Sequence, residues 1–190
     1  MRAETVTVNN GTRTIHVIQG QYGLSSRPDE VLSTLLGSCV AVCLGDPVAG
    51  IGGMNHFLLP GGSEGGQDRS LKYGVHAMEL LINSLLRGGA RRERLQARVY
   101  GGANIIENLP QIGSANARFA LWFLENERIR CVDHSLGGRQ ARRVRYWPHS
   151  GQAEVRLAGQ VEPAVAARKA ATTAGRPAPA VPAAGEITLF

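Results

Sequence analysis

Cys39 and His56 are the two residues of this chain whose types and spacing best suit covalent chemistry. A free thiol is only a few per cent ionised near neutral pH, and an adjacent imidazole can take its proton and make it a strong nucleophile. Gly37 and Ser38 directly precede the cysteine and allow a sharp bend there. Such a bend can direct backbone N–H groups at a developing oxyanion, so the segment predicts a nucleophilic cysteine with backbone oxyanion support.

The cysteine and the histidine fall on what reads as one β-hairpin, with strands at 39–46 and 50–59. Asp46 followed by proline is typical of the first two places of a type I turn. If Asp46 pairs with the fourth residue of that turn, Cys39 lies directly opposite His56, with Cβ atoms about 4.5–5.5 Å apart. A bulge would move the register by one residue and put the two side chains on opposite faces of the sheet. The glycines of the return strand make such a bulge plausible.

Composition and spacing alone also allow a structural interpretation, in which Cys39 is a small buried hydrophobe and His56 a core histidine. A zinc site is not indicated, because Cys39 and Cys43 have no matching second pair and Cys131 stands alone. The other histidines show no ligand spacing. Gly101-Gly102 belongs to no phosphate-loop or dinucleotide pattern. The sequence therefore predicts no metal and no cofactor.

The elements around the pair are mostly short strands with alternating or β-branched apolar residues, separated by turn-forming residues. Besides the hairpin, strands are predicted at 14–19, 31–36, 97–100, 128–133, 142–147 and 154–157. Apolar residues at helical spacing predict one helix over 70–87, and a second is predicted over 114–125 with Ser114 as its cap. We expect an α+β fold, a layered α/β/β-type sandwich with largely antiparallel sheets and two main helices.

The domain organisation follows from a change of composition near the C-terminus. We expect an N-terminal extension at 1–12, the main domain at 13–160, an Ala/Pro-rich linker at 161–185 and a short apolar tail at 186–190. The tail, Glu-Ile-Thr-Leu-Phe, is the kind of segment that docks as an added strand or places its aromatic ring in a pocket. Pairing with the domain's own sheet edge is the other possibility.

The net charge of +6 is carried largely by arginine, in clusters at residues 91–98 and 139–145. These clusters are either a solvated basic surface or a surface for an acidic partner. Nucleic acid is disfavoured as that partner, because aromatic residues make up only 5% of the chain and do not interleave with the basic runs. No apolar run reaches the ~20 residues that a membrane span needs. The absence of a signal-peptide core and the odd number of cysteines indicate the cytoplasm.

Two blocks around Cys39 and His56 resemble the signature of the CheD family of chemoreceptor glutamine deamidases. They are Leu-Leu-Gly-Ser-Cys-Val at 35–40 and Gly-Gly-Met-Asn-His-Phe-Leu-Leu-Pro at 52–60, with Asp46-Pro47 between them. Tyr-Gly-Gly-Ala at 100–103, Ile-Gly-Ser-Ala-Asn at 112–116 and Leu-Gly-Gly at 136–138 follow in the family's order. The resemblance covers roughly residues 13–157.

The resemblance implies a protein-glutamine glutaminase that hydrolyses selected glutamine side chains of chemoreceptor cytoplasmic helices to glutamate and releases ammonia. It places the family's catalytic cysteine and histidine on Cys39 and His56, while the oxyanion support expected at Gly37 and Ser38 rests on the bend before the cysteine. The family also has an upstream hydroxyl residue, a threonine six residues before the cysteine in some members. Here Ser33 holds that place and Thr34 follows it.

Only one of these two hydroxyls is expected to orient the His56 ring, because neighbouring strand residues point to opposite faces. Ser33 is favoured, since it holds the ungapped place and has the same parity along the strand as Cys39. The other function considered is a non-catalytic chemotaxis adaptor that binds receptors or a CheC-type phosphatase. An intact Cys-His pair favours the enzyme over that adaptor.

Overall fold

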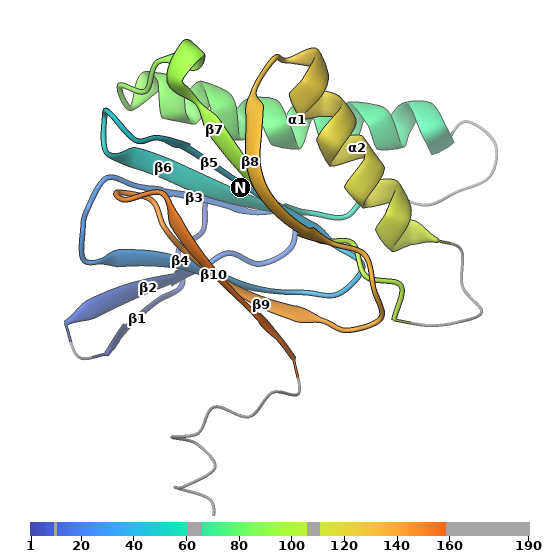
Figure 1. Cartoon of the computed structure of the whole chain (residues 1–190), viewed down its shortest axis with the longest axis horizontal. Helices are drawn as coiled ribbons and strands as arrows, with labels where there is room; N and C mark the ends of the chain where they lie inside the picture. Colours follow the sequence, from blue (N-terminus) through green and yellow to red (C-terminus); the bar gives the residue numbers. More distant parts are fainter. Residues whose placement is uncertain (10, 61–65, 106–110, 159–190) are drawn as a thin grey trace, which may run out of the picture. The chain divides into compact units, whose positions relative to one another are not determined.

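The computed structural model describes residues 1–9, 11–60, 66–105 and 111–158. Residues Met1–Ala158 form one compact unit, in which two helices lie on one side of a sheet and a second sheet lies on its other side (Figure 1). The predicted linker at 161–185 and tail at 186–190 lie outside the described residues. None of the helices in the described ranges is long and apolar enough to span a bilayer.

The sheet in the middle of the sandwich, called here the inner sheet, has the strand order β3-β6-β5-β7-β8. Its strands are β3 (Tyr22–Ser25), β5 (Val40–Asp46), β6 (Ile51–Phe57), β7 (Gln96–Gly101) and β8 (Arg130–Leu136). Helices α1 (Gly66–Arg87) and α2 (Ile112–Asn126) cover one face, and a short 3-10 helix, η1 (Arg92–Arg94), precedes β7. A core cluster that includes Val42 and Leu44 of β5, Met78 and Leu81 of α1 and Phe123 of α2 joins helices and sheet.

The second sheet, called here the outer sheet, has the strand order β1-β2-β4-β9-β10. Its strands are β1 (Val6–Asn9), β2 (Thr12–His16), β4 (Glu30–Leu36), β9 (Arg142–Trp147) and β10 (Gln152–Leu157). A second core cluster fills the space between the sheets, with Leu32, Leu36 and Val144 from the outer sheet and Met54 and Tyr100 from the inner one. Most strand pairs are antiparallel; β2–β4 and β7–β8 are parallel. The predicted layered α+β sandwich is confirmed.

Two strands were not expected from the sequence. β1 has four residues, all exposed, so it carries no buried apolar alternation. β3 also has four residues, one of them a glycine, and such a short segment gives little periodic signal. The predicted strand at 14–19 ends earlier, at His16, because the chain then turns over Gly20, whose φ is +81°.

One aromatic side chain fixes how the two sheets face each other. Gly45 and Gly52 are cross-strand partners in the inner sheet. A Cβ atom at either position would meet the hydroxyl of Tyr146, which comes from β9 of the outer sheet. Tyr146 is fully buried and its hydroxyl donates to the Leu44 carbonyl oxygen at 3.3 Å. The paired glycines therefore form a notch that receives the Tyr146 hydroxyl, and this notch aligns the sheets.

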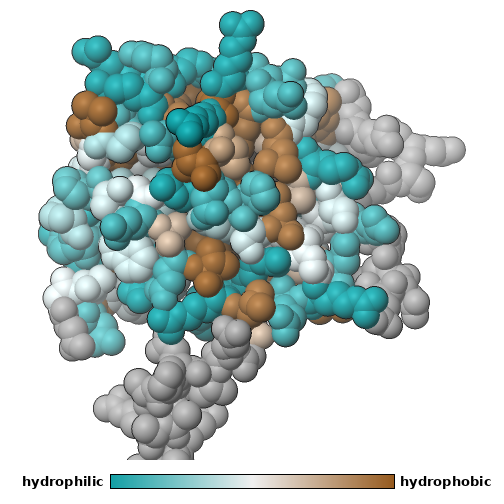
Figure 2. Space-filling model, in the orientation of Figure 1, coloured by the Kyte–Doolittle hydropathy of each residue, from teal (hydrophilic) through white to brown (hydrophobic). Residues whose placement is uncertain are grey.

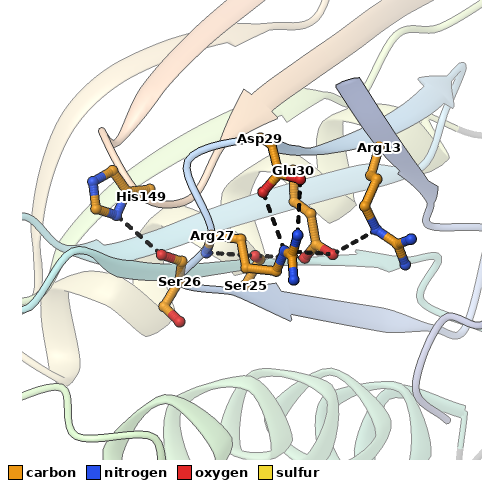
Figure 3. A network of polar contacts seen from close by, with 7 residues as sticks. All are labelled: Arg13, Ser25, Ser26, Arg27, Asp29, Glu30 and His149. Carbon is orange, nitrogen blue, oxygen red and sulfur yellow. Dashed lines mark hydrogen bonds and ion pairs between the residues drawn. The ribbon is translucent and has the colours of Figure 1, made fainter. Parts of the chain in front are cut away.

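A polar network holds the β3–β4 connection at the start of β4 (Figure 3). The buried Glu30 accepts from Ser25 Oγ at 2.6 Å and from Arg13 Nε at 3.0 Å. Arg27 bonds Asp29 through both Nε and Nη2, and His149 Nδ1 lies 3.0 Å from the Ser26 carbonyl oxygen. These contacts tie β2, β3 and β4 to the β9–β10 turn.

The outer surface is mostly hydrophilic on the face of Figure 2, with hydrophobic residues in separate patches. Among the exposed large apolar side chains are Leu121 and Trp122 of α2 and Leu35 of β4.

Candidate functional site

Cys39 and His56 do not stand directly opposite each other, so the predicted register is wrong. Asp46 pairs with Ile51, and His56 pairs with Ala41. The turn is longer than expected because Asp46 Oδ1 accepts from the N–H groups of Val48 and Ala49 at 3.0 and 3.1 Å, and Gly50 then adopts a φ of +62°. The register moves by two residues, an even number, so Cys39 and His56 still belong to the side that faces the outer sheet.

Cys39 lies in the crossover between the two sheets, in the bend predicted from Gly37 and Ser38. Three carbonyl groups of this bend are held in place. Gly37 O accepts from Ala103 N at 2.9 Å, Ser38 O from Asn116 Nδ2 at 2.9 Å and Cys39 O from Gly102 N at 2.8 Å. The Cys39 side chain is half-buried against the core cluster between the sheets. The Cys39 thiol is thus carried by a fixed loop and remains accessible.

The backbone N–H groups of Ser38 and Cys39 make no hydrogen bond within the described part of the chain. The backbone N–H of Cys39 lowers the pKa of its own thiol, against the larger rise that burial causes. Donors placed beside a nucleophile in this way are what a developing oxyanion requires. The geometry is compatible with the oxyanion support predicted at Gly37 and Ser38.

The His56 ring is fixed through Nδ1. This atom lies 3.2 Å from the Val17 carbonyl oxygen and 2.9 Å from Thr34 Oγ1. A carbonyl oxygen can only accept, so Nδ1 carries the proton, and Nε2 of the neutral ring presents a lone pair. Nε2 is buried and has no hydrogen-bond partner among the described residues. Burial lowers the pKa of His56, despite the Val17 contact, so the ring is neutral near pH 7 and available as a base.

The hydroxyl next to the His56 ring is that of Thr34, not that of Ser33. Thr34 shares the inward face of β4 with Leu32 and Leu36, whereas Ser33 shares the opposite face with Leu35, which is 55% exposed. The expectation favoured Ser33 because of its parity with Cys39. That parity does not carry through the crossover, because β4 and β5 belong to different sheets.

The expected thiol–imidazole hydrogen bond is not formed in this structure. The Cys39 thiol instead donates to Oε1 of Gln19 at 3.4 Å. Burial raises the pKa of Cys39, so the thiol is protonated near neutral pH. Gln19 is a neighbour of Cys39 that sequence reasoning missed, since it lies 20 residues upstream on a different segment.

Two further residues support the site, and only the second of them, Gly101, was expected near it from the resemblance. Asn116 of α2 is fully buried; its Oδ1 accepts from Leu59 N at 2.8 Å and its Nδ2 donates to Ser38 O. It therefore links the loop that carries Cys39 to the segment that follows His56. At Gly101, φ is +109°, and a Cβ atom would collide with the Cys39 carbonyl oxygen. The glycine is needed there for this close approach, as the resemblance implies for the Tyr-Gly-Gly-Ala block.

The two arginine clusters are less available to a partner than their sequence indicates. In the first, Arg94 bonds Asp46 at 2.6 Å and Arg92 pairs with Glu127. In the second, Arg142 is buried and donates to Ser135 Oγ at 3.0 Å. Arg145 lies over the Trp147 ring at 5.1 Å. Several of these guanidinium groups thus have partners within the chain.

The remaining cysteines lie outside the site, whereas a nearby cavity reaches His56. Cys43 is buried, and this strongly raises the pKa of its thiol; Cys131 is half-buried on β8. A cavity of about 180 Å³ lies between β3, β6 and α1, and its lining includes His56, Tyr22, Asn55 and His76. Cys39 is not among its described lining residues, so this cavity is not where the thiol is exposed.

Comparisons with known proteins identify the family of the chain. A family model described as "CheD chemotactic sensory transduction" matches residues 58–157. A protein of Rhizobium meliloti is 50% identical over 181 residues, which cover 94% of this chain and 96% of the relative. A protein of Agrobacterium fabrum is 49% identical over 178 residues, which cover 93% of this chain and 96% of the relative. A protein of Cereibacter sphaeroides is 53% identical over 144 residues, which cover 76% of this chain and 72% of the relative. Each is named probable chemoreceptor glutamine deamidase CheD. The chain described here belongs to the CheD family.

Proposed function

We propose that this protein is a protein-glutamine glutaminase that deamidates glutamine side chains of chemoreceptors, using Cys39 as nucleophile and His56 as general base and acid. The names of its close relatives support the reaction and the class of substrate. The observation that carries the mechanism is the buried, unpartnered Nε2 of His56 on the same side of the inner sheet as a half-buried thiol. An unpaired buried acceptor costs about 1–3 kcal/mol of stability, which a proton-accepting role explains.

In the first half of the reaction, the thiol gives its proton to His56 Nε2, and the sulfur attacks the carboxamide carbon of the substrate glutamine. Catalytic hydrogen bonds often tighten only when substrate is present, so the thiol turns from Gln19 to His56 at this stage. The negative charge on the carboxamide oxygen is held by the free N–H groups of Ser38 and Cys39. Nε2 then returns the proton to the amide nitrogen, the C–N bond breaks, and ammonia leaves a thioester behind.

In the second half, a water molecule attacks the thioester carbon while His56 Nε2 accepts one of its protons. The C–S bond breaks, the sulfur recovers the proton, and glutamate is released. The net change is glutamine plus water to glutamate plus ammonia, with no oxidant, metal or cofactor. Thr34 and the Val17 carbonyl keep the Nδ1 proton in place, so Nε2 keeps its lone pair through both halves.

The test is mass spectrometry of a receptor cytoplasmic fragment incubated with the protein. Wild type is expected to convert selected glutamines to glutamate, and Cys39→Ala to convert none above background. Cys131→Ala is the matched control, because it removes another half-buried thiol that lies outside the site. Conversion by Cys39→Ala at the wild-type rate would refute the nucleophile.

The predicted partners and location belong to the same proposal. Chemoreceptor cytoplasmic helices are the substrate, and the protein acts in the cytoplasm, where these helices are. Binding to a CheC-type phosphatase remains a prediction, tested by co-purification of the two proteins with Cys39→Ala, in which binding can be observed apart from turnover.

A further inference from the structure

We propose that Gln19 is a further catalytic residue, whose carboxamide accepts from the Cys39 thiol before attack and donates to the thiolate and the oxyanion during it. The inference depends on the proposed function, since it assigns a role at the same nucleophile. It starts from the 3.4 Å hydrogen bond between Cys39 Sγ and Gln19 Oε1, the only hydrogen bond that the thiol makes within the described residues.

Gln19 is held at the nucleophile by the main chain around it. Gln21 N donates to Ile18 O at 3.0 Å, and Gly20, the third residue of this four-residue turn, has φ +81° as a type II turn requires. Gln19 is the second residue of that turn, so its side chain projects from the tip. Its placement therefore follows from a defined turn.

The turn is bound to His56 on both sides of Gln19. Before it, the Val17 carbonyl oxygen contacts His56 Nδ1 at 3.2 Å. After it, Gly20 N donates to His56 O at 2.7 Å, and His56 N donates to Gln21 O at 3.0 Å. The same segment that fixes the base thus carries Gln19 to the nucleophile, and the positions of both are coupled.

A carboxamide suits this place because it offers both an acceptor and a donor. Oε1 accepts from a protonated thiol but repels a thiolate. A half-turn about the terminal side-chain bond exchanges Oε1 for Nε2, which then donates to the sulfur anion from nearly the same position. When the sulfur has attacked, the oxyanion is bonded to the neighbouring carbon, within reach of the same N–H group. Gln19 is exposed, so this rotation is not blocked by packing.

Two substitutions separate the donor role from the acceptor role. Gln19→Met keeps the length of the side chain and removes both functions. Gln19→Glu keeps the acceptor, loses the donor and adds a negative charge beside the thiolate. Gln152→Met is the matched control, an exposed glutamine at the far end of β10, paired with Trp147.

The first measurement is deamidation of a receptor fragment under single-turnover and steady-state conditions. Gln19→Met is expected to lower kcat at least about tenfold with little change in KM; the loss is smaller than the 10²–10³ typical of an enclosed oxyanion donor, since Gln19 is exposed. Gln19→Glu is expected to lower kcat at least as much, and Gln152→Met to leave it unchanged. A wild-type kcat in Gln19→Met would overturn the proposal.

The second measurement needs no receptor. The rate of Cys39 alkylation by iodoacetamide, followed at the peptide level across pH, reports the fraction of thiolate. Gln19→Glu is expected to shift this profile to higher pH, whereas Gln152→Met is expected to leave it in place. An unshifted profile in Gln19→Glu would contradict direct contact with the reacting sulfur.

The two proposals fail in distinguishable ways. If Cys39→Ala retains activity, the proposed function is wrong. If Cys39→Ala is inactive while Gln19→Met is fully active, only the role of Gln19 is wrong. Conversion of Gln19 itself to glutamate in wild type but not in Cys39→Ala would also overturn the role, because Gln19 would then be a substrate of Cys39.

Discussion

Thr34 Oγ1 lies 2.9 Å from Nδ1 of His56, and the two residues come from different sheets. The ring is therefore oriented across the interior of the sandwich, by a hydroxyl of the outer sheet acting on a base of the inner sheet. The Val17 carbonyl oxygen shares the same Nδ1 proton at 3.2 Å, so the orientation does not depend on the hydroxyl alone.

Removing the Thr34 hydroxyl is expected to weaken catalysis without abolishing it. A net hydrogen bond contributes about 0.5–1.5 kcal/mol, which corresponds to roughly a 2- to 10-fold loss of kcat in Thr34→Val. Thr34→Ser keeps the hydroxyl and should recover most of the activity. Ser33→Ala is the comparison, since Ser33 faces away from the ring; a larger loss of kcat in Ser33→Ala than in Thr34→Val would contradict the assignment.

The pH dependence of kcat/KM follows from the directions of the two pKa values. Burial lowers the pKa of His56 and raises that of Cys39, so a neutral imidazole and a protonated thiol coexist over a wide range around neutral pH. Activity is expected to form a plateau there and to fall on the acid side only below the usual histidine value of about 6.5. An acid limb centred above that value would be inconsistent with a buried neutral base.

The same histidine makes stability depend on pH. Below about pH 6.5 the unfolded chain protonates this residue while the folded chain resists, so the unfolded state binds more protons and stability falls as pH falls toward the lowered folded pKa. Denaturant unfolding of wild type and His56→Gln between about pH 5 and 7 should show a smaller slope for the variant. Equal slopes would mean that His56 is not desolvated in the folded protein.

Asp46 is expected to stabilise the hairpin turn. Burial by itself would raise its pKa, but hydrogen bonds from Arg94, from Arg91 N and from the turn N–H groups outweigh this and lower it to about 2. Asp46→Asn should cost about 1–3 kcal/mol of unfolding free energy. In wild type that contribution is present above about pH 4 and is lost as pH falls toward 2. Asp29→Asn, in the exposed pair with Arg27, should change stability little, and an equal loss in both variants would contradict the role of burial.

Gly101→Ala is expected to inactivate the site by moving the Cys39 loop, since a Cβ atom there would collide with the Cys39 carbonyl oxygen. Gly89→Ala is a close control, because Gly89 also has a positive φ, +99°, but no atom lies within 4 Å of its added Cβ. Both variants carry similar backbone strain. Only Gly101→Ala should lose Cys39 alkylation and deamidation; an equal effect of Gly89→Ala would show that strain alone is responsible.

The sequence predicted the layers of the fold because most strands carry β-branched or alternating apolar residues and α1 has a clear apolar face. It predicted β9 at 142–147 with the observed bounds. It did not identify β1, although Val6 and Val8 alternate with Thr7; the strand has only four residues and its place is set by pairing with β2. The position of such an edge strand depends on the neighbouring strand with which it pairs.

At the site, residue types were predictable and three-dimensional neighbours were not. The register error came from Asp46, whose side chain binds two N–H groups and lengthens the turn. The preference for Ser33 over Thr34 assumed that one strand parity continues through residues 37–38, where the chain passes between sheets. Gln19 and Asn116 reach Cys39 and its loop from distant segments, and no local pattern in the sequence reports such a contact.

The Tyr146 notch has a consequence for how the site tolerates change. Tyr146 pairs with Leu32, two residues before Thr34 on β4, and Gly52 stands four residues before His56 on β6. A methyl group at Gly45 or Gly52 would push against the tyrosine and shift one sheet over the other. The spacing between hydroxyl and imidazole would then change, although no residue of the site had been altered. The lack of side chains at Gly45 and Gly52 thus sets how closely the two sheets can be aligned, although both positions are remote from Cys39. Mutational scans should find inactivating substitutions at these two glycines that leave every catalytic group unchanged.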